Sequence, residues 1–137
     1  MQTFLPVPDF QTSAEQLDWR RLGKQRVEAK QILRALHGTS KGWLNHPITK
    51  MWQGYEGSLC VYGQIMCIEW TNRGYEDNLF EYFWLMSSYY PNDTLPPWFG
   101  NYELHRSHQS NLVRKDPDHY RQHYPDVPDN LPYVWYV

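Results

Sequence analysis

The chain has 137 residues, of which 17% are aromatic, and a formal net charge of −2. This length fits one domain, residues 1–137, that can bury a core without disulfides or metals, and the overall charge gives no indication of nucleic-acid binding. The first residues lack the basic start and apolar run of a signal peptide, and no stretch approaches the roughly 20 apolar residues of a membrane span.

The first part of the chain predicts an extended segment followed by two helices. Residues 1–10 contain two prolines and are expected to be extended. Thr12, with Glu15 three positions later, has the form of a capping box that would open a short helix. Asp18 can then cap a longer helix over residues 19–37.

Two glycines bear on this longer helix. Gly38 would end it, as a residue that adopts the left-handed conformation without strain. Gly23 lies inside it and costs about 1 kcal/mol relative to alanine, so a close approach by another backbone is expected there. After a loop, Pro47 suits the first turn of a helical stretch that continues to Gly74.

The second half predicts more helices and an irregular tail. Helical spacing covers residues 78–88 and 102–115, and a shorter helix restarts at Asp116 and runs through His123. No segment alternates as a strand would. We therefore expect an all-α, compact single domain of about five helices, with an extended N-terminal segment and an aromatic C-terminal tail from Tyr124.

The two cysteines indicate the compartment. Cys60 and Cys67 are seven positions apart on one predicted helix, hence about 10.5 Å apart along its axis, too far for a disulfide. They are expected to be reduced core thiols in a cytoplasmic, nucleoid-associated protein.

The helix over residues 19–37 concentrates positive charge. Between Arg20 and Lys41 the chain has seven Lys or Arg residues and a single acidic residue, Glu28. Residues three, four and seven apart share a helix face, so Arg21, Lys24 and Glu28 should line up. The pattern indicates either a polyanion-binding face that contains one general-base candidate or an ordinary solvated face with salt bridges.

Four histidines form a second cluster in the sequence. His105 and His108 are three apart, and His119 and His123 are four apart, so each pair shares a helix face. This spacing is a possible metal arrangement, but no glutamate is embedded in it and no cysteine pair lies nearby. A polar helix face that contacts phosphate or partner loops is favoured, and we expect neither a metal nor another cofactor.

Aromatic residues gather in the predicted loops and tail. They pack as core or lid residues, or some of them stack against an extruded or damaged base. The set is Trp43, Trp98, Phe99, Tyr133, Trp135 and Tyr136, and the candidates for base stacking are Trp43, Trp135 and Tyr136.

Several stretches resemble the small bacterial and phage proteins grouped with the pyrimidine dimer DNA glycosylases, the endonuclease V family. They are the opening MQTFLPVPDF and the stretches LDWRRLGKQRVEAKQILRAL, GWLNHPITKMW, YGQIMCIEWTNRGY and LHRSHQSNLVRKDPDHY. The resemblance to the bacterial branch covers nearly the whole chain. To the characterised phage enzyme it rests mainly on Arg21 and Leu22 followed by Glu28, and on Arg73-Gly74-Tyr75.

The resemblance implies an all-α, metal-independent glycosylase in which Glu28 is the catalytic carboxylate. In that family the free N-terminal amine attacks C1′ of the damaged nucleotide and forms a Schiff base, which permits abasic-site lyase activity. An α-amino group ordinarily has a pKa near 8, so a useful fraction of it is neutral at pH 7. Because the bulky Gln2 should prevent removal of Met1, the amine would be that of Met1, and Met1, Gln2 and Glu28 are the predicted catalytic residues.

The expected partner is double-stranded DNA with a damaged or modified base, bound by a monomer that contacts no membrane. The predicted DNA-binding residues are Arg20, Arg21, Lys24, Arg26, Lys30, His105, Arg106, His108, Arg114 and Lys115. Two alternatives from other classes remain open. One is a non-catalytic nucleic-acid-binding module on the same scaffold, and the other is a hydrolase that uses a metal held by the histidines.

Overall fold

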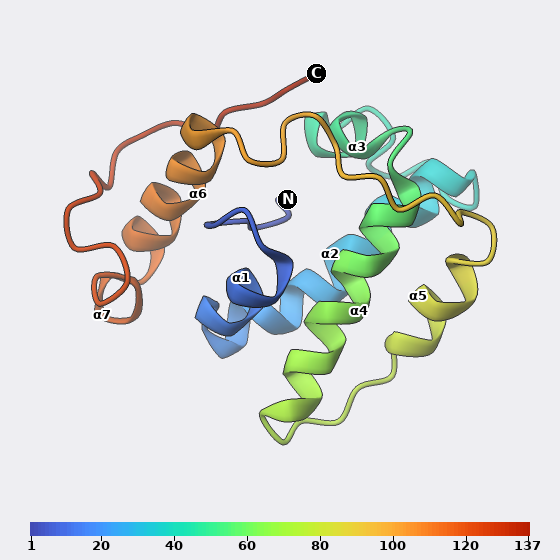
Figure 1. Ribbon diagram of the computed structural model, residues 1–137, viewed down its shortest axis with the longest axis horizontal. Helices are drawn as coiled ribbons and strands as arrows, with labels where there is room; N and C mark the ends of the chain where they lie inside the picture. Colours follow the sequence, from blue (N-terminus) through green and yellow to red (C-terminus); the bar gives the residue numbers. More distant parts are fainter.

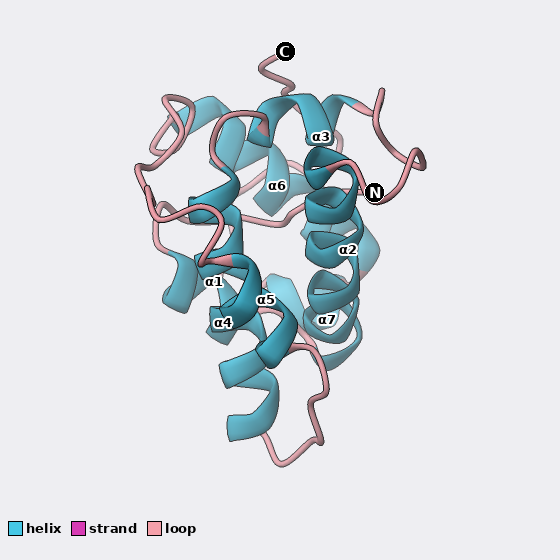
Figure 2. Cartoon of the chain, turned by 90° about the vertical axis from the view of Figure 1, so that its right-hand side faces the viewer, coloured by secondary structure: helices cyan, strands magenta, loops and turns pink.

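The computed structural model describes residues 1–137 and contains seven α-helices and no β-strand (Figure 2). The helices are α1 (Phe10–Gln16), α2 (Trp19–His37), α3 (Pro47–Trp52), α4 (Glu56–Asn72), α5 (Phe80–Met86), α6 (Tyr102–Lys115) and α7 (Pro117–Tyr120). The predicted all-α fold is confirmed. None of these helices combines the length and the apolar character needed to cross a membrane.

Helices α2 and α4 form the centre of the fold (Figure 1). They pack against each other, α1 and α5 both pack on α4, and α3 packs on α2. The N-terminal segment, residues 1–9, runs through the middle of the molecule (Figure 1). Helices α6 and α7 lie on the side of this segment that faces away from α2 and α4. Its central position makes the start of the chain part of the interior.

Helix α1 begins before the predicted capping box. Asp9 is its N-cap, and the Asp9 carboxylate accepts hydrogen bonds from the Thr12 backbone N–H at 2.7 Å and the Thr12 hydroxyl at 2.6 Å. The prediction that Thr12 caps this helix is wrong, because Asp9 supplies a charged acceptor three residues earlier.

Helix α2 has the predicted bounds, and Gly38 ends it with a φ of +84°. Asp18 stands at the N-cap position, but its side chain makes no capping hydrogen bond. Its carboxylate instead accepts hydrogen bonds from the Tyr120 hydroxyl and from Arg21, the latter at 3.2 Å. Asp18 therefore ties the start of α2 to α7 rather than capping α2.

Gly23 has a close neighbour, but it is a ring and not the backbone that we expected. A Cβ at Gly23 would lie 3.0 Å from the Trp70 indole, which packs from α4 across this face of α2. Glycine at this position thus lets α2 and α4 approach each other around a large side chain.

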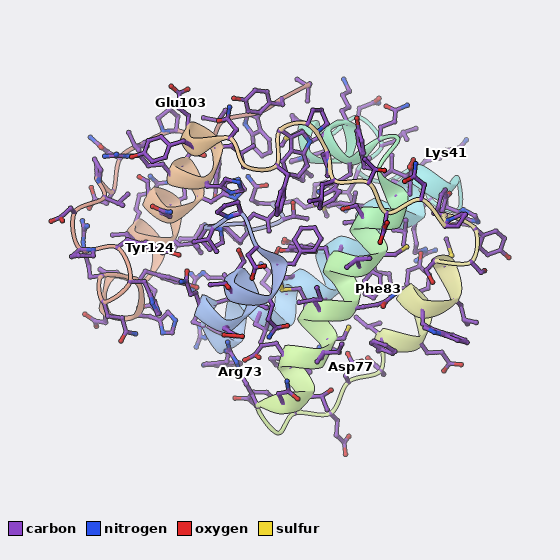
Figure 3. The ribbon with its side chains drawn as sticks, viewed as in Figure 1. Lys41, Arg73, Asp77, Phe83, Glu103 and Tyr124 are labelled. Atoms are coloured by element: carbon purple, nitrogen blue, oxygen red, sulfur yellow. The ribbon has the colours of Figure 1, made fainter.

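The helical stretch expected from Pro47 to Gly74 divides into α3 and α4. The break falls at residues 53–55, where Gly54 has a φ of +89° that residues other than glycine rarely adopt. Farther along α4, a Cβ at Gly63 would lie 2.4 Å from the ring of Phe83, which belongs to α5 (Figure 3 labels Phe83). The absence of a side chain at Gly63 therefore allows this ring to pack against α4.

Both cysteines lie on α4 and are buried and free. Burial is the main cause that raises the pKa of Cys60 to about 11 and that of Cys67 to about 12. Since the thiolate is the reactive form, neither group is an activated nucleophile.

Candidate active site

A cavity of about 420 Å³ lies where the N-terminal segment meets α2. Its walls come from the start of the chain, one face of α2, the end of α6 and the C-terminal tail. The lining residues are Met1, Gln2, Phe4, Arg20, Arg21, Lys24, Gln25, Glu28, Lys115 and Tyr133. The charged face predicted on α2 therefore forms one wall of a cavity, and Lys115 adds a cation from α6.

Gln25 fixes the N-terminal segment against α2. Its side-chain oxygen accepts a hydrogen bond from the Phe4 backbone N–H at 2.8 Å, and its amide nitrogen donates to the Gln2 carbonyl at 3.1 Å. The Tyr62 hydroxyl, from α4, contacts the Gln25 side-chain oxygen at 2.5 Å and the Phe4 carbonyl at 3.0 Å. Gln25 is 1% exposed, so these bonds are shielded from competing water.

Glu28 is half-buried beside the first residues of the chain. Its Oε2 accepts a hydrogen bond from the Gln25 amide at 3.2 Å and a long one from the Gln2 backbone N–H at 3.4 Å. The α-amino nitrogen of Met1 is three covalent bonds from the Gln2 backbone nitrogen, and Met1 lines the same cavity as Glu28. The structure thus brings Met1, Gln2 and Glu28 to one cavity.

His46 is a neighbour of the N-terminal amine that sequence reasoning missed. Burial, followed by repulsion from the N-terminal ammonium, lowers the pKa of His46. Its Nδ1 accepts a hydrogen bond from the Ile48 N–H at 3.1 Å at the start of α3. The only sequence signal at this position was the His-Pro helix start, which gives no information about the chain terminus.

The cations near the cavity influence one another. Burial lowers the pKa of Lys115, and the positive charges of Arg21, Arg114 and Lys24 lower it further, whereas Glu28 acts in the opposite direction. A phosphate placed among these side chains would relieve that repulsion. The end of α6 and the face of α2 therefore form one positively charged region.

Two predicted phosphate ligands on α2 face away from the cavity. Arg26 is 7% exposed and pairs with Asp77 at 2.6 Å, in the loop that joins α4 to α5 (Figure 3 shows Asp77). The Lys30 ammonium lies over the Tyr82 ring of α5, 4.8 Å from the ring centroid. Positions 26 and 30 therefore share the side of α2 that faces α4 and α5, not the side that lines the cavity.

His105 and His108, also predicted to bind DNA, are buried in the core, 4% and 1% exposed. His105 Nδ1 donates to the Leu5 carbonyl at 2.7 Å while its Nε2 accepts from the Gly100 N–H at 2.9 Å. His108 Nδ1 accepts from the Leu5 N–H at 2.9 Å. The pair holds the N-terminal segment from the α6 side.

Burial also keeps His108 neutral. Its pKa falls to about 3, chiefly because burial disfavours the charged ring and secondly because His105 lies close by. Burial likewise lowers the pKa of His105, although the bond to the Leu5 carbonyl opposes this. No three potential metal ligands gather anywhere in the structure.

The two arginines of α6 lie outside the cavity lining. Arg106 donates to the Tyr102 hydroxyl at 2.7 Å, and Arg114 donates to the Asp129 carbonyl at 3.0 Å. Of the residues predicted on α6, only Lys115 lines the cavity.

The aromatic residues in the cavity are not those selected for base stacking. Trp43 and Trp135 pack edge-on against His46, with centroid distances of 5.6 and 5.8 Å, and Tyr136 lines a different cavity. Phe4 and Tyr133 line the cavity beside Glu28 instead. Tyr133 belongs to the aromatic set that the sequence predicted for the loops and tail, but nothing in the sequence distinguished Phe4 from core residues.

Comparison with known proteins adds one finding. The sequence model of a family described as pyrimidine dimer DNA glycosylase matches residues 1–82. The matched part contains the N-terminal segment and α2, and hence Glu28, whereas Lys115 and Tyr133 lie beyond it. No curated protein and no solved structure matches the chain.

Proposed function

The chain belongs to the pyrimidine dimer DNA glycosylase family, and we propose that the cavity beside Glu28 is where it removes the damaged base. The family implies a DNA glycosylase whose substrate is DNA. The single observation that carries the assignment of the site is the meeting of a carboxylate, the chain's own N-terminus and four cations around one cavity. Base excision through an N-terminal amine needs these groups.

The proposed reaction begins with the neutral amine of Met1. Its lone pair forms a bond to C1′ while the C1′–N glycosidic bond breaks and its electron pair leaves on the base. The carboxylate of Glu28 stabilises the oxocarbenium-like sugar and passes one nitrogen proton to O4′ as the sugar ring opens. The product is a protonated Schiff base, and the departing base takes a proton from water.

Abasic-site lyase activity follows from the same intermediate. The Schiff base acidifies the C2′ proton, and loss of that proton expels the 3′ phosphate by β-elimination. We propose that Glu28 is positioned for this proton as well, because it lies beside the residues that would carry the sugar.

The cations are proposed to hold the DNA backbone on either side of the extruded nucleotide. Arg20, Arg21 and Lys24 on α2 and Lys115 on α6 line the cavity. Extruding a nucleotide costs a few kcal/mol, and contacts with flanking phosphates together with stacking on Tyr133 or Phe4 would offset part of that cost.

The test is single-turnover breakage of a glycosidic bond (base release) in a duplex that contains one cis-syn thymine dimer. It is detected as an alkali-labile site, because the cyclobutane ring still joins the detached base to its neighbour. Glu28→Gln keeps an oxygen that can accept the Gln2 and Gln25 hydrogen bonds but removes the charge, so release should fall roughly 10²–10⁴-fold with little change in DNA affinity. Glu15→Gln, on the exposed surface of α1, is the matched control. Unchanged release by Glu28→Gln would remove Glu28 from the reaction, and DNA binding without base release by the wild type would favour a non-catalytic module.

A further inference from the structure

The side chain of Gln2 has a donor for which the protein provides no acceptor. Gln2 is 4% exposed, and its side-chain oxygen accepts a hydrogen bond from the Thr3 N–H at 3.0 Å. This bond fixes the orientation of the amide, since the atom facing the Thr3 N–H must be the oxygen. The Nε2 group on the other side has no hydrogen-bond partner.

Buried donors are almost always paired in folded proteins, so an unpaired one calls for an explanation. Three other buried side-chain atoms share this condition: Thr49 Oγ1, Ser58 Oγ and His108 Nε2. Of the four, only Gln2 belongs to a residue that lines the cavity beside Glu28. The unpaired donor therefore belongs to a residue of the cavity where a substrate would bind.

The position of Gln2 restricts which substrate atom it can meet. Its own backbone N–H contacts Glu28, and its backbone nitrogen is three bonds from the Met1 amine, so the side chain belongs to the neighbourhood of C1′. The cations of α2 and α6 are proposed to bind the phosphates. A neutral amide suits a carbonyl acceptor, and every pyrimidine has one, O2, on the carbon next to the glycosidic nitrogen N1.

We propose that Gln2 Nε2 donates a hydrogen bond to O2 of the departing pyrimidine. This inference rests on the proposed function and assigns Gln2 a direct role in it. When the C1′–N1 bond breaks, its electron pair spreads over N1, C2 and O2, so negative charge develops on O2. A donor fixed in the site before the reaction stabilises this charge more in the transition state than in the bound substrate.

The Nε2 atom is shielded from solvent in the unliganded protein, so entry of the substrate must shift the first residues of the chain. The side chain of Met1, unbranched and half-buried, is suited to such a shift. Catalytic hydrogen bonds commonly tighten only when the substrate is bound.

Two substitutions test the donor without changing the N-terminus. Gln2→Met preserves length and removes the donor, while Gln2→Glu also retains an oxygen to accept the Thr3 N–H. Both new residues are bulky, so Met1 should stay in place, and intact mass verifies this. The matched control is Gln109→Met, because Gln109 donates to the Pro6 carbonyl at 2.7 Å and thus touches the N-terminal segment outside the cavity.

Each variant is assayed on two duplexes, one with a single thymine dimer and one with an abasic site. On the dimer, single-turnover base release by Gln2→Met and Gln2→Glu should fall roughly 10²–10³-fold, the usual effect of removing one donor to a developing anion. On the abasic site no base departs, so borohydride trapping should fall less than tenfold. Gln109→Met should stay within threefold of the wild type in both assays.

Two results would overturn the inference. One is base release by both Gln2 variants within threefold of the wild type. The other is an equal loss in both assays, which would mean that Gln2 acts on the amine or the sugar and not on the leaving base. A wild-type protein that acts on neither duplex would instead overturn the proposed function, and this inference with it.

Discussion

Lys24 and Arg26 are two positions apart on α2 and lie in opposite environments. Lys24 is exposed and lines the cavity, whereas Arg26 is buried against Asp77 and lies over the Trp70 ring, 5.0 Å from its centroid. Burial is the largest single effect on the pKa of Asp77 and raises it. Backbone hydrogen bonds, the pairing with Arg26 and a hydrogen bond with Cys67 outweigh burial, so the pKa is lowered overall. One cation is therefore available to DNA and the other is committed to the fold.

Substituting these two residues should separate stability from binding. Arg26→Met leaves the Asp77 charge buried without its partner and should lower the free energy of unfolding by about 3–5 kcal/mol. Lys24→Met should change it by less than about 0.5 kcal/mol but weaken duplex binding. Urea denaturation and fluorescence anisotropy measure the two quantities. Weaker binding at unchanged stability for Arg26→Met would mean that Arg26 contacts phosphate after all.

The N-terminal segment is held from both sides by buried side chains of three helices. Gln25 and Tyr62 bind it to α2 and α4, and His105 and His108 bind it to α6. Because the segment carries the proposed nucleophile, these four side chains fix the position of the amine relative to Glu28. Loss of these hydrogen bonds should reduce activity under conditions in which the rest of the protein is still folded.

Because His108 is neutral in the folded protein, its hydrogen bond to the N-terminal segment is sensitive to pH. Its pKa is about 3 in the folded protein and about 6.5 in the unfolded chain, so the unfolded chain binds the extra proton between these values. Stability is therefore complete above pH 6.5 and falls below it by about 1.4 kcal/mol per pH unit, or about 2 kcal/mol by pH 5. The lowered pKa of His105 acts in the same direction.

His108→Asn keeps an acceptor for the Leu5 N–H but removes the titrating ring. We expect its free energy of unfolding, measured in urea between pH 7.5 and pH 5, to decline less steeply than that of the wild type. Parallel declines in the two proteins would show that His108 does not control the acid sensitivity.

The whole molecule is slightly acidic, with a net charge of −2, yet its cations gather where DNA is expected to bind. If three or four of the cavity cations contact phosphate, the logarithm of the binding constant should fall with the logarithm of salt concentration with a slope of roughly −3 to −4. Lys24→Met should reduce the magnitude of that slope by about 1. A slope near zero, or one that Lys24→Met leaves unchanged, would place the DNA elsewhere.

Features determined by near neighbours could be predicted from the sequence. The bounds of α2, its end at Gly38 and the alignment of Arg21, Lys24 and Glu28 follow from helix geometry and capping. Features that depend on distant partners could not. Arg26 pairs with Asp77, 51 positions away, and buried His108 accepts a hydrogen bond from Leu5, 103 positions away. When those partners are left out of account, Arg26 and His108 are side-chain types that are expected on a phosphate-binding surface.

The identity of the nucleophile is the central question about this site, and borohydride trapping on an abasic duplex, followed by mass mapping of the cross-linked peptide, answers it most directly. We predict an adduct on the peptide that begins with Met1, at its α-amino group, because Met1 and Glu28 line the same cavity. An adduct on Lys24 or Lys115, or no adduct from wild-type protein that binds the duplex, would contradict the prediction.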